Sequence, residues 1–254
     1  MTIVDTPPGV PPARDLRRLW RVAVALTLPV GPLLIAVSRG ILPYWSTDSG
    51  EIIVARSLAD LPAMETIAWL GLLMMPCLLL STLALGYVAR RGAPVLATVG
   101  AGLSFVAYAN WGAAGGADYL VLALGREGVG EATVLQVVEA TLAHPIAFIA
   151  GFGWVLGHIV GTMLLGAALW RSRVVAPWVA AVVIASQPVH LVAAVIIPSV
   201  TLDVLAGWGL TAFGYAMVSV AVLRTPDAEW DLPPVRSPRA TGRARRGSAI
   251  PSHA

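Results

Sequence analysis

Residues 177–224 read PWVAAVVIASQPVHLVAAVIIPSVTLDVLAGWGLTAFGYAMVSVAVLR, two long apolar runs that are separated by little more than Pro198 and Ser199. Each run is long enough, at about 1.5 Å per residue, to cross a hydrocarbon core about 30 Å thick as a helix. Backbone N–H and C=O groups in lipid must bond within the protein, so runs of this kind are helical. The pair therefore predicts a transmembrane hairpin.

Four further apolar runs precede this hairpin, and the composition of the whole chain agrees with them. The chain has 254 residues, of which 57% are hydrophobic and only 12% are charged, whereas soluble domains carry about 25% charged residues. Such a chain has too few polar side chains to cover a water-facing surface. We therefore predict an all-α, polytopic transmembrane helical bundle with six spans. The spans lie roughly at residues 19–42, 67–89, 94–111, 145–170, 174–197 and 201–223.

One membrane domain, residues 19–224, lies between two polar ends. Residues 1–18 contain four prolines and no apolar period, and residues 225–254 form a basic tail that is rich in proline and serine. We expect both ends to be disordered. Within the first span, Pro29 and Pro32 flank a glycine, so we expect a kink there.

The arginines assign the topology, since all seventeen basic residues of the chain are arginines. With six spans, most of these arginines fall on one side of the membrane. The other side holds only Arg39, Arg56 and Arg126, together with several acidic residues. Cytoplasmic connections carry the excess of basic residues, so we predict that both termini are cytoplasmic. The basic side holds Arg14, Arg17, Arg18, Arg21, Arg90, Arg91, Arg171, Arg173, Arg224 and the arginines of the tail.

Two long connections on the outer side each contain a short amphipathic pattern. In the first, Asp48 or Ser49 can cap a short helix. In the second, Val134, Val138 and Leu142 recur every four residues and share one helical face. We predict two short outer-loop helices, which cap the bundle in preference to lying on the outer leaflet.

Polar side chains inside apolar spans are expensive and indicate a candidate site. Counting along the spans places most of them in the outer half of the bundle and one near the midplane. We therefore predict an outward-facing polar pocket, in which a carboxylate and an imidazole can pair. The candidate residues of the pocket are Asn110, His144, Gln187, His190 and Asp203, and the midplane residue is His158.

A structural interpretation of the same residues stays open. Asp203 follows Ser199 at the start of the last span, where a carboxylate favours the positive end of a helix. His190 and Gln187 can satisfy carbonyl groups that Pro188 leaves without a donor.

No motif for cofactor or catalytic chemistry is present, and we expect no cofactor and no enzyme activity. The alternatives are one haem between His158 and His190, and a zinc site made by His144, His190 and Asp203. These histidines do not form a metal-binding motif, and the single cysteine, Cys77, lies in an apolar run.

Small residues predict close helix packing in the fourth span. Gly153, Gly157 and Gly161 form a row at four-residue spacing. Packing inside the bundle is one interpretation, and contact with a second copy or a partner membrane protein is the other. The lipid bilayer is the expected environment, and the basic tail lacks a fold or aromatic platform for nucleic acid.

The end of the chain carries a resemblance. The segment Ser186-Gln-Pro-Val-His190 precedes the last span, and Glu229-Trp-Asp-Leu-Pro-Pro234 follows it. These segments resemble a group of small uncharacterised actinobacterial multi-pass membrane proteins that end in a similar Trp-Asp-Leu-Pro-Pro segment. The resemblance implies a bacterial plasma membrane and carries no activity or catalytic residue.

The expected function is a non-enzymatic small-molecule or lipid binder, or an accessory membrane subunit, that uses the outer polar pocket. A small secondary transporter is the first alternative, because several spans contain proline and because a helix–span–basic turn–span pattern occurs twice. One copy begins near Glu51 and the other near Glu131. A haem- or metal-dependent membrane enzyme is the second alternative.

Overall fold

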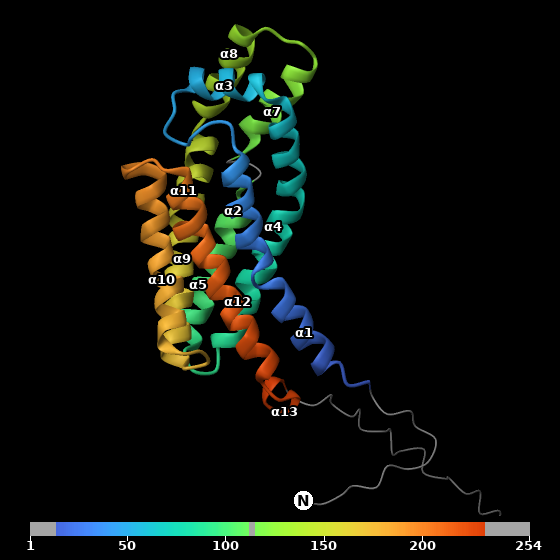
Figure 1. Ribbon diagram of the computed structural model, residues 1–254, viewed down its shortest axis with the longest axis vertical. Coiled ribbons are helices and arrows are strands. Elements are labelled where there is room, and N and C mark those ends of the chain that lie inside the picture. The colour runs from blue at the N-terminus through green and yellow to red at the C-terminus, as the bar shows by residue number, and fades with distance from the viewer. Residues whose placement is uncertain (1–13, 112–114, 232–254) are drawn as a thin grey trace, which may run out of the picture.

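The computed structural model describes residues 14–111 and 115–231, and all regular elements of that part are helices (Figure 1). Six helical spans form an elongated bundle, with three short helices at one end and one short helix at the other. The predicted all-α bundle is confirmed. Most of the predicted disordered ends, residues 1–13 and 232–254, lies outside the described residues.

The spans correspond to the predicted apolar runs. Among the described residues, five spans have the length and hydropathy needed to cross a membrane, and α5, with 16 residues, is a shorter apolar helix. The chain is therefore a multi-pass membrane protein. The spans are α1 (Arg17–Thr27) with α2 (Val30–Ile41), α4 (Leu61–Ala89), α5 (Pro94–Ala109), α9 (Pro145–Ser172), α10 (Pro177–Leu191) with η1 (Val192–Ile196), and α11 (Val200–Leu202) with η2 (Asp203–Trp208) and α12 (Gly209–Arg224).

The first span is broken where the sequence predicts a kink. Helix α1 ends at Thr27 and α2 begins at Val30, with Pro29 between them. Gly31 then lets α2 approach α4 closely, because a Cβ atom on Gly31 would lie 2.8 Å from the backbone nitrogen of Leu78. A larger residue would push the two helices apart.

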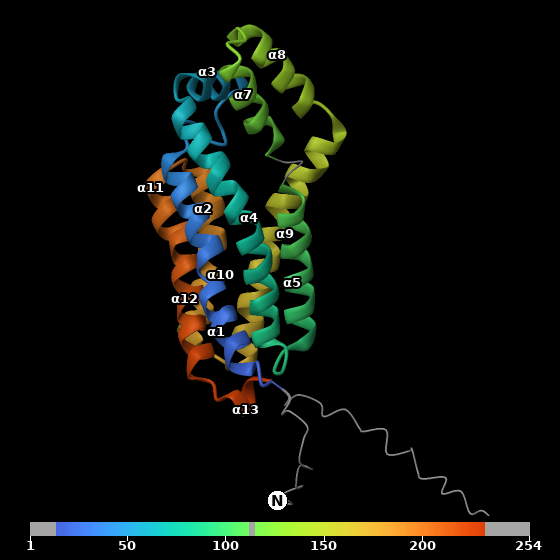
Figure 2. The ribbon, with the colours of Figure 1, turned by 90° about the vertical axis from the view of Figure 1, so that its right-hand side faces the viewer.

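The basic connections all lie at one end of the bundle. The turns from α4 to α5 and from α9 to α10, the start of α1 and the end of α12 meet at the end opposite to α3, α7 and α8 (Figures 1 and 2). This is the arrangement that six spans require. Which end faces the cytoplasm stays a prediction.

A three-helix cap covers the other end. It consists of α3 (Gly50–Ala59), α7 (Gly116–Arg126) and α8 (Glu131–Leu142) (Figure 2). The predicted helices α3 and α8 are both present, and Ser49 caps α3 by accepting a hydrogen bond from the Ile52 N–H. Val54, Val121 and Val134 form a small buried core between the three helices. The sequence analysis missed α7.

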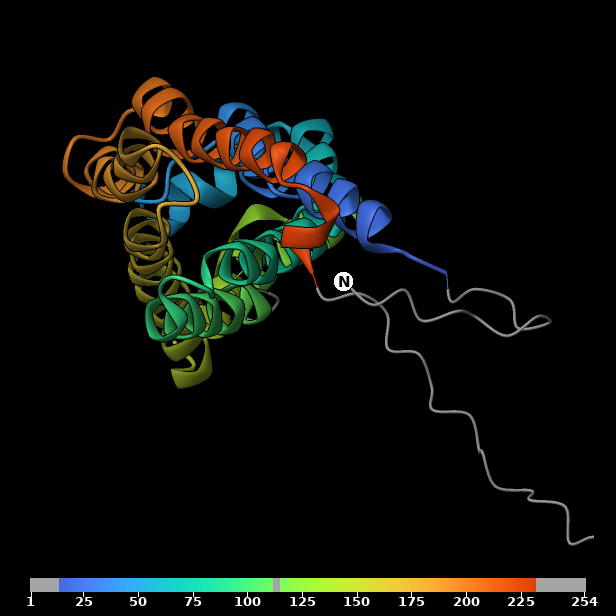
Figure 3. The same cartoon turned by 90° about the horizontal axis from the view of Figure 1, so that it is seen from below.

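At the opposite end, α13 (Asp227–Trp230) lies across the bundle (Figure 3). Trp230 is buried, and its ring lies 5.1 Å from the ring of Tyr87, centroid to centroid. Arg91 donates hydrogen bonds to the carbonyl groups of Glu229 and Trp230. Helix α13 therefore lies within the predicted disordered tail, and α1 likewise begins at Arg17, inside the predicted disordered N-terminal segment. The disorder of the two ends stays a prediction.

The glycine row of α9 packs mainly inside the bundle. A Cβ atom on Gly157 would lie 2.8 Å from the Cβ of Ala107, and one on Gly161 would lie 2.7 Å from the backbone nitrogen of Ser104, both on α5. Gly153 has open space around it. Contact with a second copy or a partner protein at the Gly153 end stays a prediction.

Candidate functional site

A buried carboxylate lies at the junction of three spans. The side chain of Asp203, at the start of η2, is 0% exposed. One of its oxygens, Oδ1, lies 2.5 Å from Nδ1 of His190 on α10, and the other, Oδ2, lies 2.8 Å from Nε of Arg39 on α2. Each carboxylate oxygen therefore has its own charge-assisted partner, and the predicted pairing of His190 with Asp203 is present.

The local backbone is shaped for this close contact. The π-helical turns η1 and η2 lie directly after His190 and at Asp203, and π-helical turns occur frequently at functional sites. Gly207 lies within η2, where a Cβ atom would be 2.7 Å from Oδ1 of Asp203 and 3.1 Å from Cα of His190. Only glycine fits between the two spans here.

The loop after α2 packs against the ion pair of Arg39 and Asp203 through Trp45. The guanidinium carbon of Arg39 lies 4.1 Å from the ring centroid of Trp45, a cation–π contact. The Trp45 indole N–H donates to the carbonyl oxygen of Ala194 in η1 at 3.0 Å. Arg39 is therefore held between the carboxylate and an aromatic ring.

A second histidine adjoins the first. The rings of His158 and His190 are 5.5 Å apart, centroid to centroid, and the Trp208 ring contacts both. Nδ1 of His158 lies 2.6 Å from the carbonyl oxygen of Trp154, so Nδ1 carries the proton and Nε2 is the acceptor. Nε2 is buried and has no hydrogen-bond partner among the described residues. We call Arg39, His158, His190 and Asp203 the polar centre.

The polar centre differs from the predicted pocket in its members. Gln187 lies beside it, where its amide nitrogen contacts the hydroxyl of Thr211 at 3.0 Å, and Thr211 in turn contacts the Gly207 carbonyl. Asn110 is exposed at the end of α5, and His144 is exposed and caps α9 through a contact with the Ile146 N–H. Asn110 and His144 therefore lie on the surface, apart from the buried group.

Arg39 is the member that the sequence analysis missed. We counted it with the outer connections, although it lies within the predicted first span at residues 19–42. A cation inside an apolar span needs a buried partner. That rule could have paired Arg39 with the one carboxylate in the last span, Asp203.

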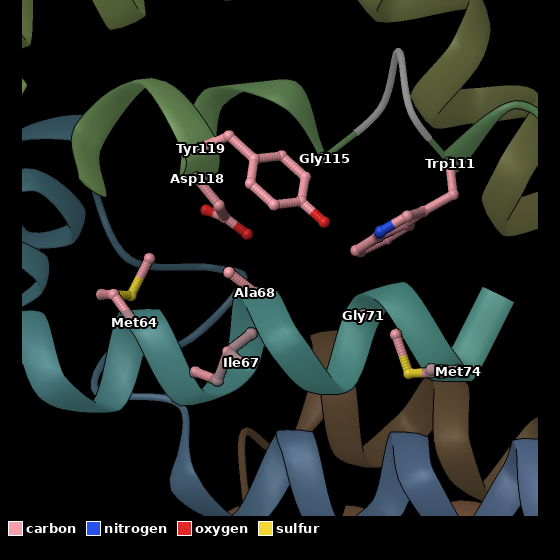
Figure 4. Close-up of a pocket in the computed structure, with 9 residues that line it drawn as sticks. All are labelled: Met64, Ile67, Ala68, Gly71, Met74, Trp111, Gly115, Asp118 and Tyr119. Carbon is pink, nitrogen blue, oxygen red and sulfur yellow. The ribbon is translucent and has the colours of Figure 1, made fainter. Parts of the chain in front are cut away.

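Rows of aromatic rings connect the polar centre to a pocket under the cap. The rings of His158 and Trp154 are 4.2 Å apart, and those of Trp154 and Trp111 are 5.0 Å apart. Trp111 belongs to the wall of a cavity of about 30 Å³ between α4 and α7, whose lining residues are drawn in Figure 4. We call this cavity the α7 pocket; it has room for little more than a water or a small group.

One carboxylate, Asp118, lies in the wall of the α7 pocket, outside the spans. Its Oδ1 accepts a hydrogen bond from the Tyr44 hydroxyl at 2.5 Å. Burial raises the pKa of the Asp118 carboxyl, and the hydrogen bond from Tyr44 offsets part of that rise. Burial and the neighbouring carboxylate raise the pKa of Tyr44 well above its usual value, so its hydroxyl remains a donor.

The arrangement of the histidines bears on the metal and haem alternatives. Within residues 14–111 and 115–231, His, Cys, Asp and Glu side chains do not gather in groups of three or more that could hold a metal ion. A haem between His158 and His190 would have to separate two rings that are in near contact. The residues present therefore do not fit either group, and what they offer is a buried carboxylate that is paired with an imidazole and a guanidinium group.

The fold and the polar centre define a class: a multi-pass helical membrane protein with ionisable side chains buried between its spans. Comparisons of the chain with models of protein families, with curated proteins and with solved structures gave no match.

Proposed function

We propose that this chain is a small secondary transporter whose polar centre takes up and releases a proton during transport. The observation that carries the proposal is the fully buried carboxylate of Asp203, which Arg39 and His190 hold from opposite sides. Ionisable residues at such depth mark ion pathways and proton relays in membrane proteins.

The three charges are suited to proton exchange. Arg39 and Asp203 neutralise each other, and His190 supplies an imidazole, a general acid–base group. When His190 loses its proton, Arg39 still pairs with the carboxylate, so the centre does not contain an unpaired buried charge. His158 is adjacent, and its buried Nε2 has no hydrogen-bond partner among the described residues.

The backbone around the centre supports movement as well as binding. Transporters place their sites where spans are discontinuous. Here the fifth span, α10 with η1, and the last span each contain a π-helical turn, and the first span is broken near Pro29. The order of a cap helix, a long span, a turn and a second span also occurs twice, at α3–α4–α5 and at α8–α9–α10.

Proton flux in proteoliposomes tests this proposal. Vesicles with purified protein and an enclosed pH-sensitive dye are given a panel of small organic ions, and we expect protein-dependent acidification or alkalinisation for at least one class. Asp203→Asn should abolish it, whereas Glu127→Gln, at an exposed carboxylate of the cap, should leave it unchanged. A panel without any protein-dependent flux would overturn the transporter proposal.

A second candidate function is a small-molecule or lipid binder, or an accessory subunit, without transport. The α7 pocket favours it, because that pocket lies under the cap and does not require the polar centre to change. Saturable binding without proton flux would support this candidate.

The cellular setting is also a proposal. The arginine-rich end supports cytoplasmic termini, and the Trp-Asp-Leu-Pro-Pro resemblance supports a bacterial plasma membrane. A homo-oligomer or partner contact would use the open Gly153 end of α9.

A further inference from the structure

The α7 pocket combines one carboxylate with aromatic rings. Figure 4 shows Asp118, Tyr119 and Trp111 on the α7 side, facing Met64 and Met74 on α4. Most of the lining is apolar, so Asp118 is the only formal charge in the wall. The pocket thus offers a single negative charge in an aromatic and apolar setting.

Asp118 lacks a cationic partner in the described part of the chain. Its hydrogen-bond partner is the Tyr44 hydroxyl, which is a neutral donor, whereas the cap arginines Arg56 and Arg126 pair with Asp48 and Glu65. A partly buried carboxylate without a counter-charge is unfavourable. A bound cation would supply the missing charge.

The other walls select the kind of cation. Aromatic faces such as those of Trp111 and Tyr119 attract ammonium groups, and methionine side chains adapt to the shape of a bound group. Calcium and magnesium ions require several oxygen ligands, whereas the side chains that line this pocket offer one carboxylate and the Tyr119 hydroxyl. We propose that the α7 pocket binds a small organic cation, the ammonium group of a primary amine, through the Asp118 carboxylate and the Trp111 and Tyr119 rings.

The inference names the substrate class of the proposed transporter, and its biological meaning rests on that proposal. Trp111 contacts Trp154, which contacts His158 of the polar centre. A continuous series of ring contacts therefore joins the pocket to the polar centre. Exchange of one monovalent cation for one proton would leave the charge of the protein unchanged.

Equilibrium binding to the purified full chain tests the inference without any gradient. Methylammonium chloride is titrated in a non-ionic detergent against sodium chloride at equal ionic strength, with tryptophan fluorescence and calorimetry as readouts. We expect saturable binding that Asp118→Asn weakens by about tenfold or more, because the charge is lost. Glu127→Gln, which removes an exposed carboxylate just after α7, should bind as the wild type does.

A second variant guards against a folding defect in Asp118→Asn. Tyr119→Leu keeps the carboxylate and alters a side chain that is 45% exposed, and it should weaken binding severalfold. Absence of saturable binding by the wild type would overturn the inference. So would binding by Asp118→Asn and by Tyr119→Leu that is as tight as binding by the wild type. Binding that is present in Asp203→Asn while flux is absent would support the pocket and separate it from transport.

Discussion

At the scale of single residues, the two partners of Asp203 have different roles. Arg39 holds a permanent charge against the carboxylate, whereas His190 contributes an imidazole, which can act as a proton donor or acceptor. Loss of Arg39 leaves a buried carboxylate that depends on a protonated imidazole. Loss of His190 leaves the Arg39–Asp203 pair intact.

Arg39→Gln should therefore destabilise the protein by about 3–5 kcal/mol, the range for breaking a buried ion pair. Adding Asp203→Asn to it should recover much of the loss, because the unpaired charge is removed. Thermal unfolding in detergent measures both variants. The control is Arg126→Gln, whose exposed partner is Glu65, with an expected change of about 1 kcal/mol or less. An Arg39→Gln variant as stable as the wild type would contradict this account of the centre.

Asp118 gives a prediction about pH. Its pKa is raised in the folded protein by burial. The folded state then binds the proton more tightly than the unfolded chain, so this contribution to stability is full at acidic pH and is lost as pH rises through the folded pKa. Asp118→Asn should accordingly raise the unfolding temperature more at pH 7 than at pH 4. A lower unfolding temperature at pH 7 would show that the ionised carboxylate stabilises the cap.

At the scale of elements, η2 must bring α10 and the last span into contact. Gly207→Ala should destabilise the protein by about 1–3 kcal/mol, as overpacking does, because the new methyl group would meet Asp203 and His190. It should also reduce proton flux in vesicles. Gly153→Ala, where the added methyl group has open space, is the matched control and should be neutral or slightly stabilising. Equal effects of the two substitutions would argue against the close packing at η2.

The sequence predicts the elements well where hydropathy decides them. The spans, the break near Pro29 and the cap helices α3 and α8 all follow from apolar periodicity and from Pro or Ser at helix ends. The π-helical turns could not be predicted, because apolar periodicity does not distinguish a single π-helical turn from the α-helix around it.

The site could be predicted only in part, for a reason of geometry. Counting residues along each span places His158 and His190 at different depths, yet their rings are 5.5 Å apart. Counting ignores the tilt of helices and the reach of side chains. The same method put Asn110 and His144 with the buried residues, although both are exposed.

At the scale of the whole molecule, one end of the bundle is basic and the other carries the cap. In a background with Cys77→Ala, a cysteine at Glu131 in the cap should react with a membrane-impermeant maleimide on intact cells. A cysteine at Val174, in the α9–α10 turn, should react only after permeabilisation. The reverse pattern would place the termini outside the cell.

The proposed transporter depends on proton exchange at His190 inside the bundle. Cation-driven proton flux into dye-loaded proteoliposomes should be abolished by His190→Gln, which keeps the Arg39–Asp203 pair, and should be unchanged by His144→Gln, at the exposed histidine that caps α9. Wild-type flux in a folded His190→Gln variant would contradict the account.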